Sequence, residues 1–248
     1  MDGSAGAACW RRRRTRRSHG GQAWFTASVT SVLECRALLF DVDGTLVDSR
    51  RATCEAWAAV ARELGADAEA VAEASLHARA AELVERYFAP GQHAEATERS
   101  LRAQVASGAS VEALPGAAAL LASLPGDAWA VVTSGRREIM AARLTGAGLP
   151  VPATVVSSES VERGKPEPDP YRAGAAALGV DPGDCVAFED TAQGVTSAHA
   201  AGVRVVGVTG GRPADDLLAA GADVVVADLA AVGVHATPDG LRVEVRPA

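Results

Sequence analysis

The sequence of 248 residues contains a single lysine, Lys165, among its 24 basic residues. A chain that uses arginine almost everywhere else has one ammonium group, which suggests a local role for that group. Aromatic residues make up only 4% of the chain. Alanine, valine and leucine must therefore fill the core that a hydrophobic content of 48% supports.

Paired cysteines and long apolar runs are also missing. The four cysteines are scattered, with no C-x-x-C pair, which favours a reduced, cytoplasmic protein over a disulfide or zinc framework. No run approaches the roughly 18 uninterrupted apolar residues of a membrane helix, so we expect no membrane partner. The length allows one ordinary domain with a smaller appendage, and we expect a monomer.

The start of the chain differs from the rest in its charge. Six arginines lie between positions 11 and 17, where the only nearby acid is Asp2, and the remaining chain is strongly acidic. An acidic body repels nucleic acid, so we expect none at the functional site. We expect residues 1–32 to form a basic, disordered tail, or an over-long start of the reading frame.

Two other interpretations of this tail stay open. It could be an arm that binds nucleic acid or a membrane surface. It could also be an export signal, because Arg16 and Arg17 precede a mildly apolar stretch at 23–33. Hydroxyl residues interrupt that stretch and a core strand follows almost at once, so export is the least favoured.

From residue 37 onward, short apolar runs alternate with helical segments. The runs are typical of strands buried on both faces and lie at 37–40, 128–132, 153–156, 185–188, 203–208 and 223–226. The helical segments between them lie at 117–124, 137–144, 170–178, 192–201 and 214–220. This alternation predicts an α/β fold with a doubly wound parallel sheet.

One interval, between Ser49 and Leu114, contains no strand-like run. Its amphipathic stretches at 53–64, 69–88 and 94–107 predict a small all-helical cap inserted after the first strand. We therefore assign 51–113 to the cap, and 33–50 with 114–248 to the core. The alternating stretch 241–245 predicts a short, half-exposed edge strand.

Two acids follow the first buried strand directly. Asp41 and Asp43 have the same parity, so an extended chain would point both to one side while Val42 packs on the other. Gly44 permits a sharp turn that exposes backbone N–H groups to an anion. The alternative is a pair of aspartates that caps the following turn.

A second pair, Glu189 and Asp190, ends the strand at 185–188. Because the ends of parallel strands meet at one edge, these acids should converge with Asp41 and Asp43. A set of carboxylates without histidine or cysteine favours a hard cation, and Mg²⁺ is the expected cofactor. The alternative for the second pair is an N-cap of the helix that begins near Ala192.

The strand at 128–132 ends in two hydroxyl residues. Thr133 and Ser134, with Gly135 behind them, could hold a phosphoryl oxygen, although such residues also form ordinary turns. Lys165, placed in the rigid segment 164–170 by two neighbouring prolines, could neutralise the remaining phosphoryl charge.

Together these motifs resemble the haloacid dehalogenase-like phosphohydrolase superfamily. The match consists of D-x-D-G-T at 41–45, a hydroxyl at Thr133, Lys165 and the acid pair at 189–190, in that order and with a cap-sized gap. It covers roughly 36–229. The resemblance implies that Asp41 is the nucleophile, which becomes an aspartyl-phosphate, and that Asp43 is the general acid and base. Thr133 and Lys165 would hold phosphate, and Asp41, the Asp43 carbonyl and Asp190 would bind Mg²⁺. From their places at the strand ends, we add Ser134 to the phosphate-binding residues and Glu189 to the metal ligands.

Within that family, the cap indicates a class of substrate. His77 and Arg79 resemble the H-G-R motif of small-molecule phosphatases, with Ala78 in place of the glycine; alternatively, they lie on an exposed helix face. The expected function is a Mg²⁺-dependent phosphatase of small phosphorylated sugars or polyols. The first alternative is a hexose-phosphate mutase of the beta-phosphoglucomutase type, and a second is a non-catalytic binding protein that works through its basic tail.

Overall fold

The computed structural model describes residues 31–76 and 78–246. The strands are β1 (Ser31–Cys35), β2 (Ala37–Phe40), β3 (Val47–Asp48), β4 (Glu112–Ala113), β5 (Trp129–Val132), β6 (Val155–Val156), β7 (Cys185–Glu189), β8 (Arg204–Val208), β9 (Val224–Val226), β10 (Val232–Thr237) and β11 (Gly240–Val245). The α-helices are α1 (Arg50–Leu64), α2 (Ala68–Ala74), α3 (Ala80–Tyr87), α4 (His93–Ser107), α5 (Ala117–Ala122), α6 (Arg137–Gly146), α7 (Asp169–Ala177), α8 (Ala192–Ala200) and α9 (Asp215–Ala219).

The central sheet has six parallel strands in the order β6-β5-β2-β7-β8-β9. The first of these strands in the sequence, β2, lies inside the sheet, where Leu39 faces Ala130 of β5 and Ala187 of β7. Strands that follow β2 in the sequence are added on both sides of it. The prediction of a doubly wound parallel sheet is therefore confirmed.

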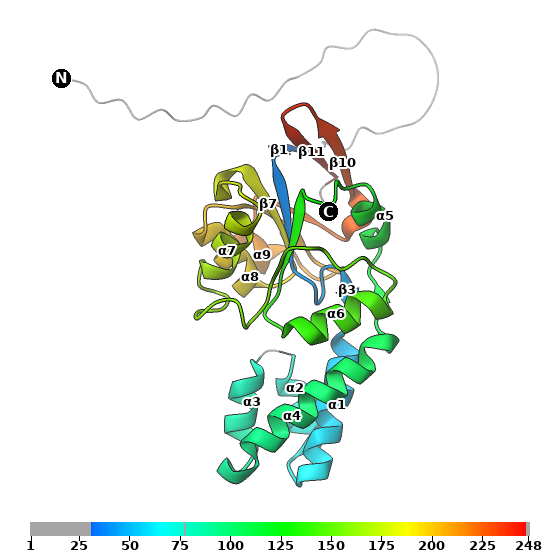
Figure 1. Ribbon diagram of the computed structural model, residues 1–248, viewed down its shortest axis with the longest axis vertical. Coiled ribbons are helices and arrows are strands. Elements are labelled where there is room, and N and C mark those ends of the chain that lie inside the picture. The colour runs from blue at the N-terminus through cyan, green and yellow to red at the C-terminus, as the bar shows by residue number, and fades with distance from the viewer. Residues whose placement is uncertain (1–30, 77, 247–248) are drawn as a thin grey trace, which may run out of the picture.

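Successive residues of each strand pack into two separate apolar clusters, one on each face of the sheet. Leu38 and Phe40 belong to the cluster beneath α5 and α6, whereas Leu39 belongs to the cluster beneath α7, α8 and α9. Figure 1 shows these two groups of helices on opposite sides of the sheet. Burial on both faces explains why the strands are apolar without alternation.

A second sheet, with the order β1-β11-β10, packs at the end of the molecule opposite the helices α1 to α4 (Figure 1). The prediction of an edge strand at 241–245 is wrong in position, because β11 is the central strand and pairs antiparallel with β1 and β10. β1 begins at Ser31, two residues inside the segment assigned to the basic tail. Residues 1–30 of that tail lie outside the described residues.

The helices α1 to α4, hereafter the cap helices, occupy the interval between β3 and β4 in which a cap was expected. They share an apolar cluster of their own, centred on Trp57, Leu83 and Phe88. The stretch at 69–88, expected to be one helix, is divided into α2 and α3. The Ser75 hydroxyl donates to Ala72 O at 2.6 Å where α2 ends, and such a bond competes with helix continuation. That 51–113 forms a separate domain remains our interpretation.

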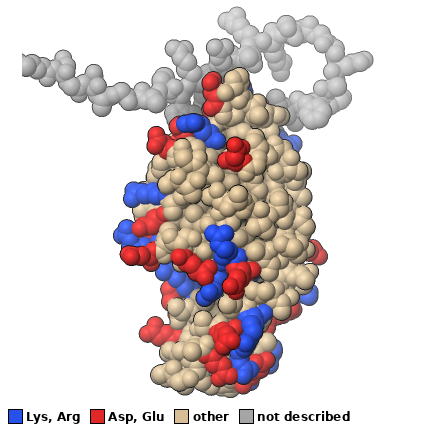
Figure 2. All heavy atoms as spheres, viewed as in Figure 1, with Lys and Arg blue, Asp and Glu red and all other residues tan. Residues whose placement is uncertain are grey.

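Figure 2 shows basic and acidic side chains mixed over the face of the cap helices that it draws. Arg102 and Glu98 form an i,i+4 pair of this kind on α4, with 2.6 Å between Nη1 and Oε1. Exposed pairs contribute little to stability, so the apolar cluster is what holds the cap helices together. None of the helices within the described residues combines the length and apolar composition that a membrane span requires.

Candidate active site

The carboxyl ends of β2, β5 and β7 meet at one edge of the sheet, which faces the cap helices. Asp41 follows β2, and its backbone N–H donates to Phe188 O of β7 at 3.0 Å. A cavity of about 610 Å³ lies between this edge and the cap helices. Most of the expected site residues line it: Asp41, Asp43, Arg79, Thr133, Ser134, Lys165 and Asp190. Glu189 is not part of the lining, and His77 lies outside the described residues.

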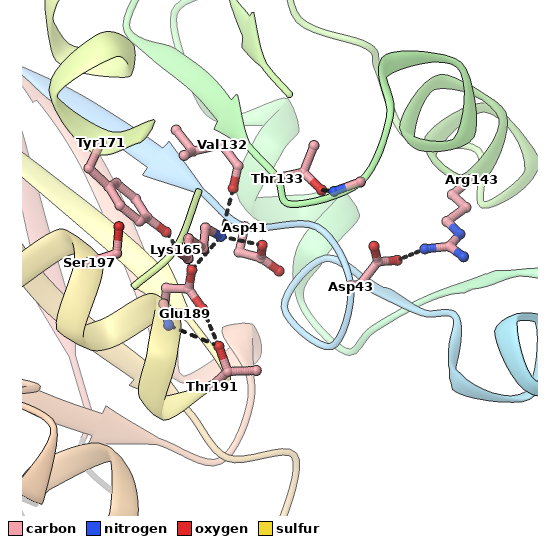
Figure 3. A network of polar contacts seen from close by, with 12 residues as sticks. Asp41, Asp43, Val132, Thr133, Arg143, Lys165, Tyr171, Glu189, Thr191 and Ser197 are labelled. Carbon is pink, nitrogen blue, oxygen red and sulfur yellow. Dashed lines mark hydrogen bonds and ion pairs between the residues drawn. The ribbon is translucent and has the colours of Figure 1, made fainter. Parts of the chain in front are cut away.

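The ammonium group of Lys165 is buried at the floor of this cavity. Its Nζ donates to Asp41 Oδ1 at 2.6 Å, to Glu189 Oε1 at 2.5 Å and to the Val132 carbonyl at 2.9 Å. Figure 3 shows Lys165 between the two carboxylates. These three hydrogen bonds use every hydrogen of the ammonium group, so its position is fixed.

Glu189 is fully buried, and its carboxylate fixes the Lys165 ammonium group from the side of the protein core. The Tyr171 hydroxyl donates to the same Oε1 atom at 2.6 Å, and the Thr191 hydroxyl donates to Oε2 at 3.3 Å. The site also requires a glycine at position 194, because a Cβ there would lie 2.0 Å from both carboxylate oxygens. The N-cap of α8 is Thr191 and not the acid pair, so the N-cap alternative for Glu189 and Asp190 is wrong.

Asp190 approaches Asp41 closely because residue 44 is glycine. A Cβ on Gly44 would lie 2.1 Å from Asp190 Oδ2, and the φ of Gly44 is +89°. Arg212 Nη2 donates to Oδ2 at 3.1 Å, whereas the buried Oδ1 has no hydrogen-bond partner among the described residues. Oxygen atoms of Asp41, Glu189 and Asp190 lie within 4.8 Å of one another. A buried, unpartnered carboxylate oxygen in an oxygen-only group fits a hard cation such as Mg²⁺.

The pKa values at this edge reflect the crowding of buried carboxylates. Burial raises the pKa of Asp41 well above its ordinary value, and Lys165 offsets this only in part. Burial, together with Glu189, raises the pKa of Asp190 to about 7 against the opposing effect of Arg212. Burial alone would lower the pKa of Lys165, but Asp41 and Glu189 outweigh it and leave that pKa raised. The cluster therefore lacks positive charge, and a bound divalent cation would supply it.

The Asp43 carboxylate has different partners from Asp41, although both residues line the cavity. Ser49 Oγ and Arg143 Nη1 each donate to Asp43 Oδ1 at 2.5 Å. In Figure 3 the Asp43 side chain points toward Arg143, away from Lys165. Within the described residues, the hydrogen bonds to Asp41 and Asp43 carboxylates come from side chains, which argues against the turn-capping alternative.

Thr133 and Ser134 lie where β5 ends, next to Lys165. The buried Thr133 Oγ1 accepts a hydrogen bond from the Gly135 N–H at 3.0 Å, which leaves its own hydrogen available to the cavity. Ser134 is exposed in the cavity wall. Arg79 lies in the break between α2 and α3, and its Nη2 donates to the Lys165 carbonyl at 2.9 Å. This bond joins the cap helices to the loop that contains Lys165.

The sequence interpretation missed two arginines of this site, Arg143 and Arg212. Arg212 follows β8 at the same edge as Asp190, and the rule that parallel strand ends meet could have found it. Arg143 lies in the last turn of α6, 100 residues from the Asp43 that it contacts. No local pattern marks such a residue.

The comparisons with known proteins agree with this geometry. The family model of haloacid dehalogenase-like hydrolases matches residues 35–202, which is more than half of the chain. The chain belongs to this family. The resemblance inferred from the motifs is thereby confirmed.

Among curated proteins, this member of the family is 40% identical to hexitol phosphatase A of Escherichia coli over 84% of the chain and 98% of that protein. It is 33% identical to glycerol-1-phosphate phosphohydrolase 2 of Saccharomyces cerevisiae over 78% of the chain and 82% of that protein. Both relatives are named as phosphate-releasing enzymes, and the family member described here is a phosphoric monoester hydrolase.

Among solved structures, the chain is similar to a variant of CbbY from Rhodobacter sphaeroides in complex with xylulose-(1,5)-bisphosphate. The TM-score is 0.69 and the identity 27%, over 80% of this chain and 96% of CbbY. The likeness extends over nearly the whole of CbbY.

Proposed function

We propose that this enzyme is a Mg²⁺-dependent phosphatase that hydrolyses small phosphorylated polyols or sugars through an aspartyl-phosphate at Asp41. The observation that carries the proposal is the contact between the Asp41 carboxylate and the only lysine, at the floor of a cavity that polar cap side chains line in part. The names of the two curated relatives support the same class of substrate.

In the first half of the proposed reaction, an Asp41 oxygen attacks the phosphorus atom of the ester. A bond forms between that oxygen and phosphorus, and the bond from phosphorus to the substrate oxygen breaks. The Lys165 hydrogen that now points to Asp41 would turn to a phosphoryl oxygen, while Glu189 and Val132 keep the ammonium in place. The Thr133 hydroxyl would hold another phosphoryl oxygen.

Asp43 would act as the general acid in the first half of the reaction and as the general base in the second. It would donate a proton to the departing alkoxide, so that the product leaves as an alcohol. It would then accept a proton from water as the water oxygen bonds to phosphorus. The bond from phosphorus to Asp41 breaks, which releases inorganic phosphate and restores both carboxyl groups to their starting states.

The cation would be held by Asp41 and Asp190, with the Asp43 carbonyl as a third ligand. When bound, Mg²⁺ supplies positive charge to the transferring phosphoryl group. Glu189 was expected among the ligands, but both of its oxygens already accept hydrogen bonds. We therefore propose that Glu189 positions Lys165 and that the unpartnered Oδ1 of Asp190 faces the cation.

The cap side chains that line the cavity favour a substrate whose part beyond the phosphate is uncharged and carries hydroxyl groups. Thr97, Ser100 and Gln104 line the cavity at i, i+3 and i+7 of α4, and Trp57 of α1 adds an aromatic surface. Hydroxyl and amide groups next to an aromatic ring are suited to a carbon chain that carries hydroxyl groups. We propose that 51–113 acts as a cap domain with this role and that the enzyme is cytoplasmic.

The experiment is a measurement of phosphate release from a panel of polyol, sugar and nucleotide monophosphates, with Asp41→Asn as the inactive control. We expect release from polyol or sugar phosphates and none from the control. Rapid acid quench should trap phosphate on the peptide that contains Asp41. Faster interconversion of hexose monophosphates than phosphate release would instead establish the mutase alternative, and turnover by Asp41→Asn would overturn the proposal.

A further inference from the structure

Arg143 is a buried arginine that belongs to the core but contacts the proposed acid. It lies on α6, and 4% of its surface is exposed. Its Nη1 donates to Asp43 Oδ1 at 2.5 Å, and Figure 3 shows the guanidinium group directed at that carboxylate. The polar atoms of a buried guanidinium group need hydrogen-bond partners, so its contacts are informative.

The remaining contacts of this guanidinium group are with the cap helices. Nη2 donates to Thr53 Oγ1 of α1 at 2.8 Å and to Gln104 Oε1 of α4 at 3.1 Å. The Nε atom has no hydrogen-bond partner among the described residues. One planar group therefore joins Asp43 to two separate cap helices, which lie 90 and 39 residues away from Arg143 in the sequence.

These contacts also orient the cap side chains within the cavity. Because the Gln104 carbonyl oxygen accepts from Arg143, the amide hydrogens of this cavity-lining residue are left for another acceptor. Thr53 accepts from Arg143 in the same way, so its own hydroxyl hydrogen is left for another acceptor. A substrate hydroxyl that contacts Gln104 or Thr53 would thus affect the position of the Arg143 guanidinium group, which holds Asp43.

We propose that Arg143 is a positioning residue that couples the cap helices to the Asp43 carboxylate. The inference rests on the proposed function, because it assumes that Asp43 protonates the leaving group. Contact between the substrate and the cap places Arg143, and Arg143 places Asp43 at the leaving oxygen. Binding energy from a part of the substrate that does not react is then used at the reacting centre. Lysine cannot replace this planar fork, because its ammonium group is compact and cannot span three partners in one plane.

The test compares two leaving groups in rapid-quench, single-turnover experiments. An alkyl phosphate releases an alkoxide, which needs a proton, whereas p-nitrophenyl phosphate releases a phenolate that leaves without one. For Arg143→Met and Arg143→Lys, alcohol release from the best alkyl phosphate of the panel should slow by about 100-fold, the scale of general acid catalysis. Release of p-nitrophenolate should slow by less than about threefold, and KM for both substrates should change little.

A second variant tests the connection to the cap without changing the arginine. The pair Thr53→Val with Gln104→Leu removes both cap acceptors and leaves Arg143 and Asp43 intact. It should also slow alcohol release more than p-nitrophenolate release. If Arg143→Met does not fold, this pair carries the test. The control is Arg137→Met on the same helix, an exposed arginine that does not line the cavity and should behave as wild type on both substrates.

The outcomes separate the inference from the proposed function. If wild-type enzyme releases alcohol from no alkyl phosphate, the proposed function fails and the coupling fails with it. If wild-type enzyme is active but the Arg143 variants and the cap pair slow both leaving groups equally, only the coupling is overturned. If the Arg143 variants show only a higher KM, or only a lower melting temperature with unchanged rates, the coupling is also overturned. Arg143 would then be a structural contact between the core and the cap helices.

Discussion

The Nζ atom of Lys165 lies 2.6 Å from Oδ1 of Asp41, although 124 residues separate them in the sequence. The lysine is 6% exposed and has a second buried carboxylate, Glu189, on its other side. An isolated surface lysine would be replaceable, but this one forms ion pairs with two buried acids. Its removal should therefore affect folding as well as catalysis.

For Lys165, we expect both Lys165→Met and Lys165→Arg to lose at least about 100-fold in phosphate release, because neither provides a compact ammonium group at Asp41. Lys165→Met should also lower the free energy of unfolding by about 3–5 kcal/mol, the usual cost of leaving buried charge unpaired. Urea titration and phosphate release measure the two effects. The control is Arg163→Met, an exposed residue of the same loop, which should leave the urea midpoint and the rate nearly unchanged. Wild-type activity in Lys165→Arg would contradict the assignment.

The second prediction concerns Gly194 on α8. Alanine is normally the better helix residue by about 1 kcal/mol. Here, Gly194→Ala should instead destabilise the protein by about 1–3 kcal/mol or more, because the new Cβ would collide with the buried carboxylate of Glu189. Differential scanning calorimetry provides the measurement. Gly183→Ala is the matched control, because a Cβ there meets nothing within 4 Å; equal melting temperatures for the two variants would count against the described packing of Glu189.

The third prediction concerns the cation. Added Mg²⁺ should raise the melting temperature of protein freed of metal with EDTA, because a ligand that binds only the folded state stabilises it. The shift should vanish in Asp190→Asn, which removes the negative charge of the side chain whose Oδ1 has no hydrogen-bond partner among the described residues. Asp67→Asn, a change at the N-cap of α2, should keep the full shift. EDTA should abolish phosphate release and Ca²⁺ should restore it poorly; full turnover in metal-free buffer would remove the cation from the proposal.

The fourth prediction uses three cysteines as probes of burial. Burial raises the pKa of Cys35 to about 12 and that of Cys185 to about 11, so hardly any reactive thiolate forms at either residue near neutral pH. Cys54 is only half-buried. Under native conditions, N-ethylmaleimide should label Cys54 well before the other two, which should react only in denaturant. Peptide mapping by mass spectrometry resolves the three sites, and early labelling of Cys185 would contradict the described core.

The sequence was sufficient for the central sheet because strands buried on both faces are continuously apolar. The run before Asp41 and the run before Glu189 are of this kind, and the rule that parallel strand ends meet placed their acids together. The unique lysine was also identifiable, because its chemistry contrasts with the rest of the composition. The fold and the outline of the site could therefore be predicted from local patterns.

The parts that could not be predicted depend on partners far away in the chain. β1 and β11 come from opposite ends of the described chain, and neither is recognisable as paired until both are in place. The role of Arg143 can be inferred only from the positions of Asp43, Thr53 and Gln104, which lie in three other parts of the chain. Tertiary contacts of this kind carry no periodic signal in the sequence.

The order of strands in the central sheet has a consequence for how the enzyme assembles. The cap helices pack through a cluster drawn from one continuous segment, so they can fold from local contacts. β2 instead cannot form its strand pairs until β5 and β7 have been made. These two strands flank β2 in the sheet, but both come after the cap helices in the sequence. During synthesis, Asp41 emerges early and meets Glu189 only when β7 has been made. A chain halted before Cys185 should contain a folded cap and no catalytic site, so activity should be acquired in one late step of folding.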